Sequence, residues 1–255
     1  MSPAQVAAPM VSQIAVAALL ALAVAGVMPT VVGRLPEPAP EAEPDLATAA
    51  HPEVEPPKEL YADLGRLRVL RVGVPIASVL LALVVTARVN GGFPALMWAA
   101  LIPPLLALSV IDWRTHLLPT RILLPLTLGV MAVGAVVAGV SGEWQPWVRA
   151  MIAMLVLRSF FWVLWRIRRA GMGFGDVRLA ALLGFALGWL GVAEVVVGLY
   201  AAFIGFAVPA LVVLVVRRDK RVLKAQVPFG PFLVAGALVG VLAGPQIIGW
   251  LGYGG

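Results

Sequence analysis

The chain contains no cysteine, and only 13% of its 255 residues are charged. The absence of cysteine excludes a disulfide framework, cysteine-ligated zinc, iron–sulfur clusters and thiol catalysis. Histidine is nearly as scarce, because the sequence holds only His51 and His116, which are too few for a metal site built from histidines. We therefore expect no metal site built from cysteine or histidine.

Apolar residues are abundant instead, at 61% of the chain. A soluble domain is only about 45–50% apolar and about 25% charged, so a water-soluble enzyme is excluded. A membrane-spanning helix needs ~20 apolar residues. The sequence thus predicts an all-α, polytopic membrane protein, a bundle of about eight transmembrane helices, with spans near 11–32, 72–88, 94–111, 121–140, 147–165, 177–193, 195–216 and 232–252. The number falls to six or seven if 177–193 is re-entrant or if 11–32 does not cross.

Lysine and arginine indicate the orientation, because short cytoplasmic loops collect them. Placing 33–71, 112–121, 166–178 and 217–231 inside accounts for 16 of the 19 basic residues. Arg88 and Arg149 then fall outside, and Arg158 lies within a span, where it either snorkels or pairs with a carboxylate or carbonyls. Because topology explains the basic residues, the net charge of +6 does not predict a nucleic-acid partner. Both termini are expected outside a plasma membrane.

The segment 36–60 differs from the rest of the chain. It is rich in proline, glutamate and alanine and has no aromatic residue. Such a segment cannot bury enough surface to order itself, so we expect a disordered cytoplasmic tether. The domain plan is therefore an N-terminal transmembrane helix (1–32), a largely disordered cytoplasmic loop (33–71) and a membrane-embedded domain (72–255).

The distribution of the 13 carboxylates points to a site. Eight of them lie in segment 37–63, while Asp112 ends the third span and Asp176 opens the sixth. Acidic groups at membrane depth are costly and commonly functional. The alternative is a pair of ordinary helix-end residues, since Asp is a favoured N-cap. That alternative suits Asp176 but not Asp112, which lies at a helix C-terminus.

Three segments near the cytoplasmic boundary surround these aspartates. Asp112 is followed by Pro119, and Asp176 closes a glycine-rich stretch that contains Gly173 and Gly175. Glycine permits unusual dihedral angles and close approach of another chain, although a flexible loop would also contain it. The third segment, Pro228-Phe229-Gly230-Pro231, enters the last span from the same side.

Together these segments resemble the type IV prepilin peptidases, membrane aspartyl proteases of the Gly-x-Gly-Asp type. The matching positions are Asp112 with Pro119, the signature Gly173-Phe174-Gly175-Asp176, and the stretch from Pro228 to Pro231, within roughly residues 95–245. The resemblance implies that Asp112 and Asp176 are catalytic. Arg178 stands where the family usually has lysine, which keeps the charge but cannot give up a proton.

The resemblance also implies a substrate and a chemistry. The protein would cut the basic leader from prepilins or pseudopilins at the cytoplasmic face, just before the apolar helix of the pilin, with no metal or organic cofactor. One aspartate would take a proton from water while the protonated partner binds the scissile carbonyl. Because Asp176 precedes a helix and Asp112 follows one, helix dipoles predict that Asp176 carries the charge.

A departure from the family lies after the first span. Many bacterial members carry there an insert with paired cysteines, associated with methylation of the new pilin N-terminus. The cysteine-free 33–71 loop replaces it, so peptidase activity without methyltransferase activity is expected. The alternatives are a proton-coupled transporter, which would need polar groups at several depths, and an inactive pilus-assembly scaffold. Membrane lipids are the other expected partner, and the sequence does not predict an oligomeric state.

Overall fold

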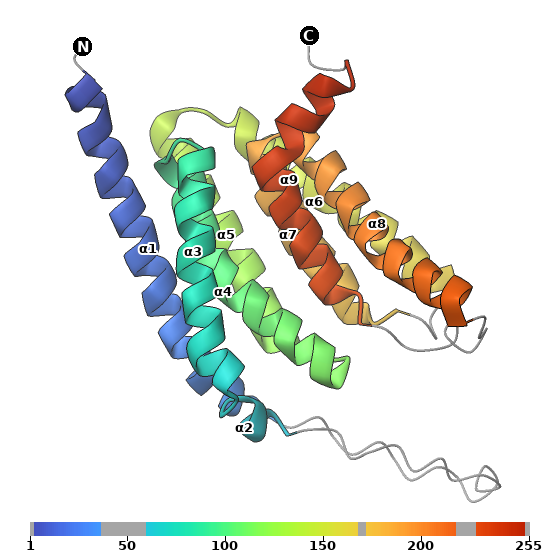
Figure 1. The fold of residues 1–255 in the computed structure, drawn as a ribbon. Helices are drawn as coiled ribbons and strands as arrows, with labels where there is room; N and C mark the ends of the chain where they lie inside the picture. The colour runs from blue at the N-terminus through green and yellow to red at the C-terminus, as the bar shows by residue number, and fades with distance from the viewer. Residues whose placement is uncertain (1–2, 37–59, 168–171, 218–227, 253–255) are drawn as a thin grey trace, which may run out of the picture.

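The computed structural model describes residues 3–36, 60–167, 172–217 and 228–252. These ranges form helices and contain no strand, which confirms the predicted all-α fold (Figure 1). The long helices are α1 (Pro3–Gly33), α3 (Val74–Arg88), α4 (Gly92–Thr115), α5 (Thr120–Ser141), α6 (Gln145–Ile167), α7 (Phe174–Leu190), α8 (Val192–Arg217) and α9 (Gly230–Trp250). A short helix α2 (Tyr61–Leu64) and a π-helical turn η1 (Val69–Gly73) precede α3.

Seven of the described helices are long and apolar enough to cross a membrane, in agreement with a multi-pass membrane protein. Helix α7 is not among the seven, because it has 17 residues. It ends three residues earlier than predicted, because the run expected at 177–193 ends as a helix at Leu190, before the extended backbone of Gly191. Nearly every residue of α7 from Asp176 onward is buried, so this short helix lies inside the bundle.

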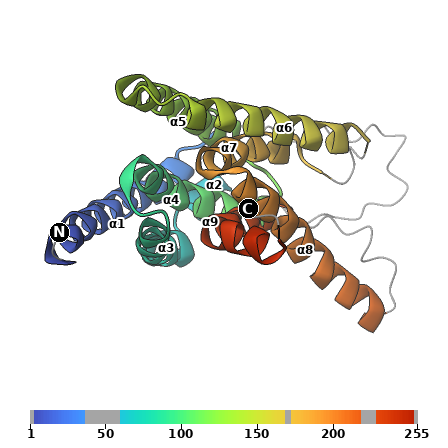
Figure 2. The same ribbon diagram turned by 90° about the horizontal axis from the view of Figure 1, so that it is seen from above.

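Helices α4, α7 and α9 form the centre of the bundle. Helix α7 packs between α6 and α9, while α4 packs against α9 and is flanked by α1 and α3 (Figure 2). The core is apolar, and its largest fully buried side chains include Trp98 and Leu105 of α4, Phe161 of α6 and Phe185 of α7. The end of α4 and the start of α7 therefore both belong to central helices.

Glycines allow α6 and α7 to pack closely. A Cβ atom added at Gly184 would lie 2.9 Å from the Ala153 carbonyl oxygen, and one at Gly188 would lie 2.5 Å from the Ala153 Cβ. Both distances are shorter than real contacts, so only glycine permits this approach. The spacing of Gly184 and Gly188, two small residues four positions apart, predicts helix packing, and these contacts agree with it.

Two arginines outside the predicted cytoplasmic loops bind helix backbone. The Arg149 guanidinium donates from Nε to the Gly188 carbonyl (2.8 Å) and from an Nη to the Trp189 (2.6 Å) and Leu190 (3.0 Å) carbonyls. These carbonyls at the end of α7 have no partner within the helix. Arg88 Nε likewise donates to the Leu242 carbonyl in α9 (2.9 Å). Contacts between helices, rather than the rule that basic residues gather in cytoplasmic loops, therefore explain where Arg88 and Arg149 lie.

Arg158 is a different case. Its side chain is exposed on α6. Of the two expectations for this residue, the exposure favours a guanidinium that snorkels along the outside of the bundle over one that pairs with an intramembrane carboxylate.

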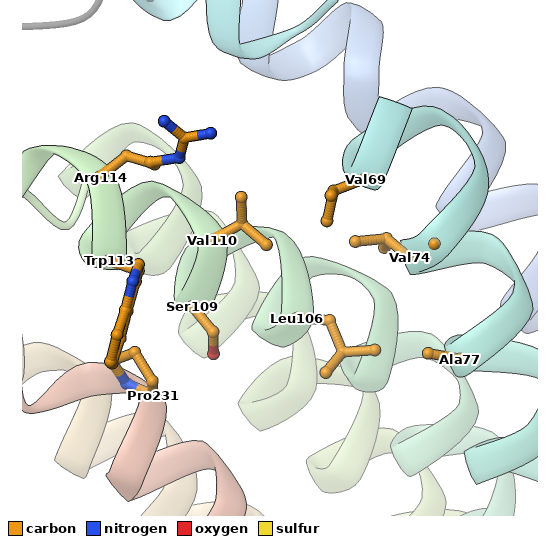
Figure 3. A pocket seen from close by; sticks show the side chains of 10 residues that line it. Val69, Val74, Ala77, Leu106, Ser109, Val110, Trp113, Arg114 and Pro231 are labelled. Carbon is orange, nitrogen blue, oxygen red and sulfur yellow. The ribbon is translucent and has the colours of Figure 1, made fainter. Parts of the chain in front are cut away.

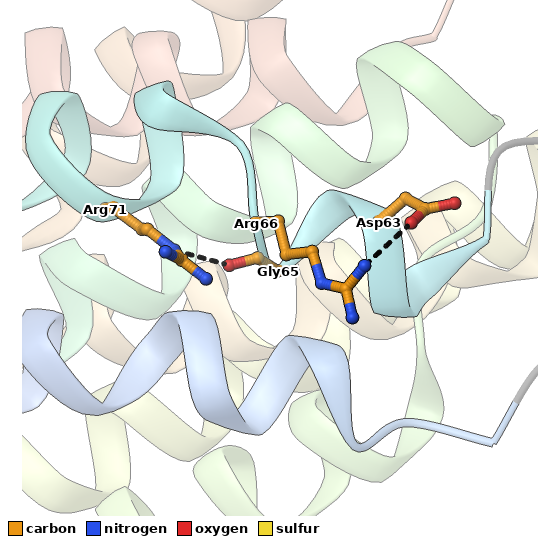
Figure 4. Close-up of polar contacts among 4 residues, drawn as sticks. All are labelled: Asp63, Gly65, Arg66 and Arg71. Atoms are coloured by element: carbon orange, nitrogen blue, oxygen red, sulfur yellow. Dashed lines mark hydrogen bonds and ion pairs between the residues drawn. The ribbon is translucent and has the colours of Figure 1, made fainter.

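The segment before α3 folds back onto α1 and α4. Tyr61, Leu64 and Leu70 are buried in a second apolar cluster, to which α4 contributes Ile111, the residue before Asp112. Arg71 Nε donates to the Gly65 carbonyl (3.4 Å), and Arg66 forms an exposed ion pair with Asp63 (3.8 Å; Figure 4). The cluster therefore packs against the last turns of α4, next to Asp112.

Several expectations fall outside the described residues. The predicted disordered tether 36–60 is described only at Pro36 and Leu60. Arg168, Arg169 and the basic cluster at 218–221 also lie outside the described ranges. The orientation of the chain therefore stays a prediction.

Candidate active site

Asp112 lies in the last turn of α4 and is 4% exposed. Helix α4 continues to Thr115, four residues beyond the predicted end of the span at 111. It ends because His116 adopts a left-handed conformation (φ 55°) and donates its backbone N–H to the Asp112 carbonyl (2.9 Å). Asp112 is thus held inside a capped helical turn.

Asp176 lies in the first turn of α7 and is 5% exposed. Helix α7 starts at Phe174, so Gly173 occupies the N-cap and Asp176 is the third helical residue. The idea that Asp176 caps its own helix is therefore wrong. Its backbone N–H donates to the Gly173 carbonyl (3.2 Å), while its carboxylate oxygen Oδ1 is buried without a hydrogen-bond partner.

Gly230 connects the third segment to the first aspartate. Its backbone N–H, at the start of α9, donates to Asp112 Oδ2 (3.0 Å). A Cβ atom at position 230 would lie 2.6 Å from this oxygen, so only glycine allows the approach. A backbone N–H that donates to a carboxylate stabilises its negative charge, and the N-terminus of α9 adds to the effect. The prediction from helix dipoles, which placed the charge on Asp176, did not include this donor.

The structure brings the two aspartates together at one end of the bundle. Asp112 is close enough to Asp176 for the two carboxyl groups to interact electrostatically. Within the described ranges they are the only buried acidic or basic side chains. The same part of the chain holds no cluster of three His, Asp or Glu residues that could bind a metal ion. Two adjoining carboxyl groups can share one proton, which is the arrangement used for acid–base cleavage by paired aspartates.

The two glycines of the signature serve different purposes. A Cβ atom at Gly175 would lie 2.6 Å from Leu118 Cβ, so the 116–119 connection packs directly on the backbone of α7. Gly173 instead has ordinary extended angles (φ −71°, ψ 146°) and is exposed beside Asp176. Close approach therefore explains Gly175, whereas the unusual dihedral angles expected for these glycines are absent from both.

Pro119 and Arg178 join α5 to the site. Pro119 is the N-cap of α5, and its carbonyl accepts the Ile122 N–H (3.1 Å). Arg178 donates to Thr120 Oγ1 in the first turn of α5, and its guanidinium lies 4.7 Å from the centre of the Phe174 ring. Arg178 thus ties α7 to α5, which makes it a structural partner of the signature.

Phe229 anchors the third segment. Its buried ring contacts Phe161 of α6 and Phe203 and Phe206 of α8, with ring centres 5.2–5.9 Å apart. Pro231, in the first turn of α9, fixes a backbone angle compatible with the helix start. Pro228 lies half-buried before Phe229. The aromatic contacts and Pro231 together position the Gly230 N–H.

Sequence reasoning missed Leu118, Thr120 and the partners of Phe229. Leucine, threonine and phenylalanine are ordinary in apolar helices and their connections, so no local pattern distinguishes them. Their roles follow only from contacts between segments far apart in the sequence.

The fold and site define a helical membrane protein with a buried aspartate pair, and comparisons with known proteins identify its family. The model of the type IV leader peptidase family matches residues 99–214, which include Asp112, Asp176, all of α7 and most of α4. The chain belongs to this family. No solved structure matches the chain.

Curated relatives agree with this assignment. The chain is 33% identical over 182 residues to a prepilin leader peptidase/N-methyltransferase from Pseudomonas putida, covering 68% of this chain and 59% of that protein. It is 31% identical over 180 residues to one from Aeromonas hydrophila, with 69% and 59% covered. For one from Escherichia coli (strain K12) the values are 28% over 149 residues, 58% and 61%. The chain thus spans about three fifths of the length of these relatives.

Proposed function

We propose that the protein is a membrane aspartic endopeptidase that removes the leader peptide from type IV prepilins or pseudopilins. The observation that carries the proposal is that Asp112 and Asp176 are both buried at one end of the bundle and close enough for their charges to interact. The names of the relatives, which are prepilin leader peptidases, supply the substrate class.

The contacts of the two carboxyl groups suggest separate roles. Asp112 accepts the Gly230 N–H, which favours the charged form that takes a proton from water. Asp176 has an oxygen without a partner, Oδ1, which is available to donate its proton to the scissile carbonyl. This assignment reverses the one from helix dipoles alone. Acid–base groups in such positions contribute about 10² to 10⁴-fold to a rate.

Co-expression with a candidate prepilin, in cells without another prepilin peptidase, tests the activity. Asp112→Asn and Asp176→Asn should each lower leader removal by at least about 10²-fold while the protein remains inserted. Asp63→Asn is the matched control, because Asp63 is exposed and pairs only at the surface with Arg66. Substantial processing by either site variant would remove that aspartate from the mechanism.

Infrared difference spectra of the carboxyl groups test the roles. The band of a protonated carboxyl group should persist in Asp112→Asn and disappear in Asp176→Asn. The opposite result would exchange the roles and leave the pair intact.

We also propose that this chain does not methylate the new N-terminus of its product. The segment between α1 and α3, where the family resemblance implies an insert with paired cysteines, contains no cysteine. Mass spectrometry of pilin processed by this enzyme alone tests the proposal. A mass increase of one methylene group on the first residue would refute it.

The proposed orientation places the aspartate pair at the cytoplasmic face of a plasma membrane, with both termini outside. The cysteine-free sequence suits a labelling test, because any single introduced cysteine is unique. Asp63→Cys should react with a membrane-impermeant maleimide only after the cells are opened, and Glu143→Cys should react in intact cells. The reverse pattern would invert the orientation.

A further inference from the structure

An apolar groove of about 550 Å³ lies along the C-terminal half of α4, the helix that carries Asp112. One wall comes from η1 and α3, the other from α4, and Pro231 of α9 closes one end (Figure 3). Apart from Arg114, the lining residues are apolar or small, and the hydroxyl of Ser109 is already used, because it donates to the Leu105 carbonyl (2.9 Å). The groove therefore suits an apolar occupant.

One end of the groove is lined by residues next to the site in the chain. Trp113 and Pro231 line it, and each is the chain neighbour of a residue in the Asp112–Gly230 hydrogen bond. Figure 3 shows the Trp113 ring next to Pro231, with the groove continuing along α4 past Val110 to Leu106. A polypeptide whose backbone lies at the carboxyl pair would meet this groove on leaving it.

The lining has the spacing and composition of a surface against which a transmembrane helix packs. Leu106, Val110 and Trp113 follow one another at intervals of four and three residues, so they form one face of α4 about two turns long. Small residues stand on both walls, Gly73 and Ala77 on one and Ser109 on the other. Small residues are what lets membrane helices approach closely, whereas a lipid chain has no need of them.

We propose that this groove holds the apolar helix of the substrate, the segment that follows the cleaved bond, as an additional helix against α3 and α4. The inference rests on the proposed function and extends it, because it assigns a place in the enzyme to the part of the substrate that is not cut. The groove raises affinity for substrate, and the aspartates perform the cleavage.

A matched pair of substitutions on α3 tests the proposal. Ala77→Phe fills the groove, while Ala87→Phe makes the same change at an exposed position on the same helix. With purified full-length enzyme and intact prepilin, Ala77→Phe should raise KM about tenfold and leave kcat unchanged. The reason is that extra side-chain volume at a packed site costs about 1–3 kcal/mol of free energy. Ala87→Phe should leave KM within about twofold of the wild type, as is usual for an exposed position.

The outcomes separate this inference from the proposed function. If the wild-type enzyme does not cut prepilin, the proposed function fails. If it cuts and Ala77→Phe has the KM of Ala87→Phe, only the groove assignment fails. A fall in kcat without a rise in KM would also overturn the assignment, since it would indicate a disturbed aspartate pair.

Photo-crosslinking supplies a readout that does not need turnover. Benzoylphenylalanine at position 77 or 87 is placed in the Asp112→Asn/Asp176→Asn background, and prepilin is added in lipid nanodiscs. Position 77 should crosslink to the apolar helix of prepilin and position 87 should not. Equal adducts from both positions, or adducts from position 77 only with lipid or with a second enzyme chain, would overturn the proposal.

Discussion

Replacing Gly230 by alanine should damage catalysis by moving one carboxyl group. The added Cβ would lie 2.6 Å from Asp112 Oδ2 and 3.2 Å from its Cγ, so the carboxyl group must shift away. The shift lengthens the hydrogen bond from the Gly230 N–H, now 3.0 Å. Phe229 cannot easily yield, because its ring is packed among three other phenylalanines.

The size of the effect follows from these distances. A carbon–oxygen contact of 2.6 Å must open to an ordinary van der Waals distance, a displacement of about 1 Å. A misplacement of about 1 Å costs roughly 10²-fold in rate. A hydrogen bond to a charged group is worth about 1.5–3 kcal/mol, which gives a loss of similar size. Because the interaction belongs to the reacting group and not to the substrate, the loss should appear in kcat with KM unchanged.

The assay is leader removal by purified enzyme, measured over a range of prepilin concentrations. Gly249→Ala is the matched control, because Gly249 lies on the same helix and a Cβ there has nothing within 4 Å. Gly236→Ala separates catalytic from packing damage, since its Cβ would lie 2.5 Å from the backbone of α8. It should lower the unfolding temperature.

The reasoning would be refuted if Gly230→Ala kept more than half of the wild-type kcat. It would also be refuted if kcat fell only in proportion to a lowered unfolding temperature, as in Gly236→Ala. In that case the glycine would serve packing between helices and not the position of Asp112.

Other contacts around the site give further predictions. Gly175→Ala, whose Cβ would lie 2.6 Å from Leu118 Cβ, should lower kcat, and adding Leu118→Gly should restore it; no rescue would contradict the assigned contact. Thr120→Val should lower the free energy of unfolding by about 1–2 kcal/mol, and it should have no effect when Arg178→Met is already present. Arg149→Met removes three hydrogen bonds to the end of α7 and should lower that free energy by about 2–3 kcal/mol, measured by reversible denaturation in detergent, while Arg149→Lys should recover part of it.

The fold class, the approximate spans and the two aspartates are all readable from the sequence. They can be read from the sequence because they depend on local properties of the chain. A run of ~20 apolar residues must cross or lie in a membrane wherever it occurs, and a carboxylate at its end is conspicuous without any knowledge of packing. The same holds for Gly184 and Gly188, whose spacing alone places them on one helix face.

Helix ends were less accessible to sequence reasoning. Helix α7 begins at Phe174 and ends at Leu190, against 177–193 expected, and α4 continues to Thr115. Ends depend on backbone conformations, such as the left-handed His116 and the extended Gly191, that hydropathy does not encode. As a result the sequence placed both aspartates outside their helices, although each lies within a terminal turn.

The electrostatic environment of the site was decided by the tertiary structure alone. Asp112 and Gly230 are 118 residues apart, and their hydrogen bond exists because α9 packs against α4. From the sequence, the charge of each aspartate could be predicted only from the dipole of its own helix, and the two dipoles favoured a charge on Asp176. The opposite assignment that we propose rests on a donor contributed by a distant helix at 3.0 Å, and such a donor becomes visible only when the helices are assembled.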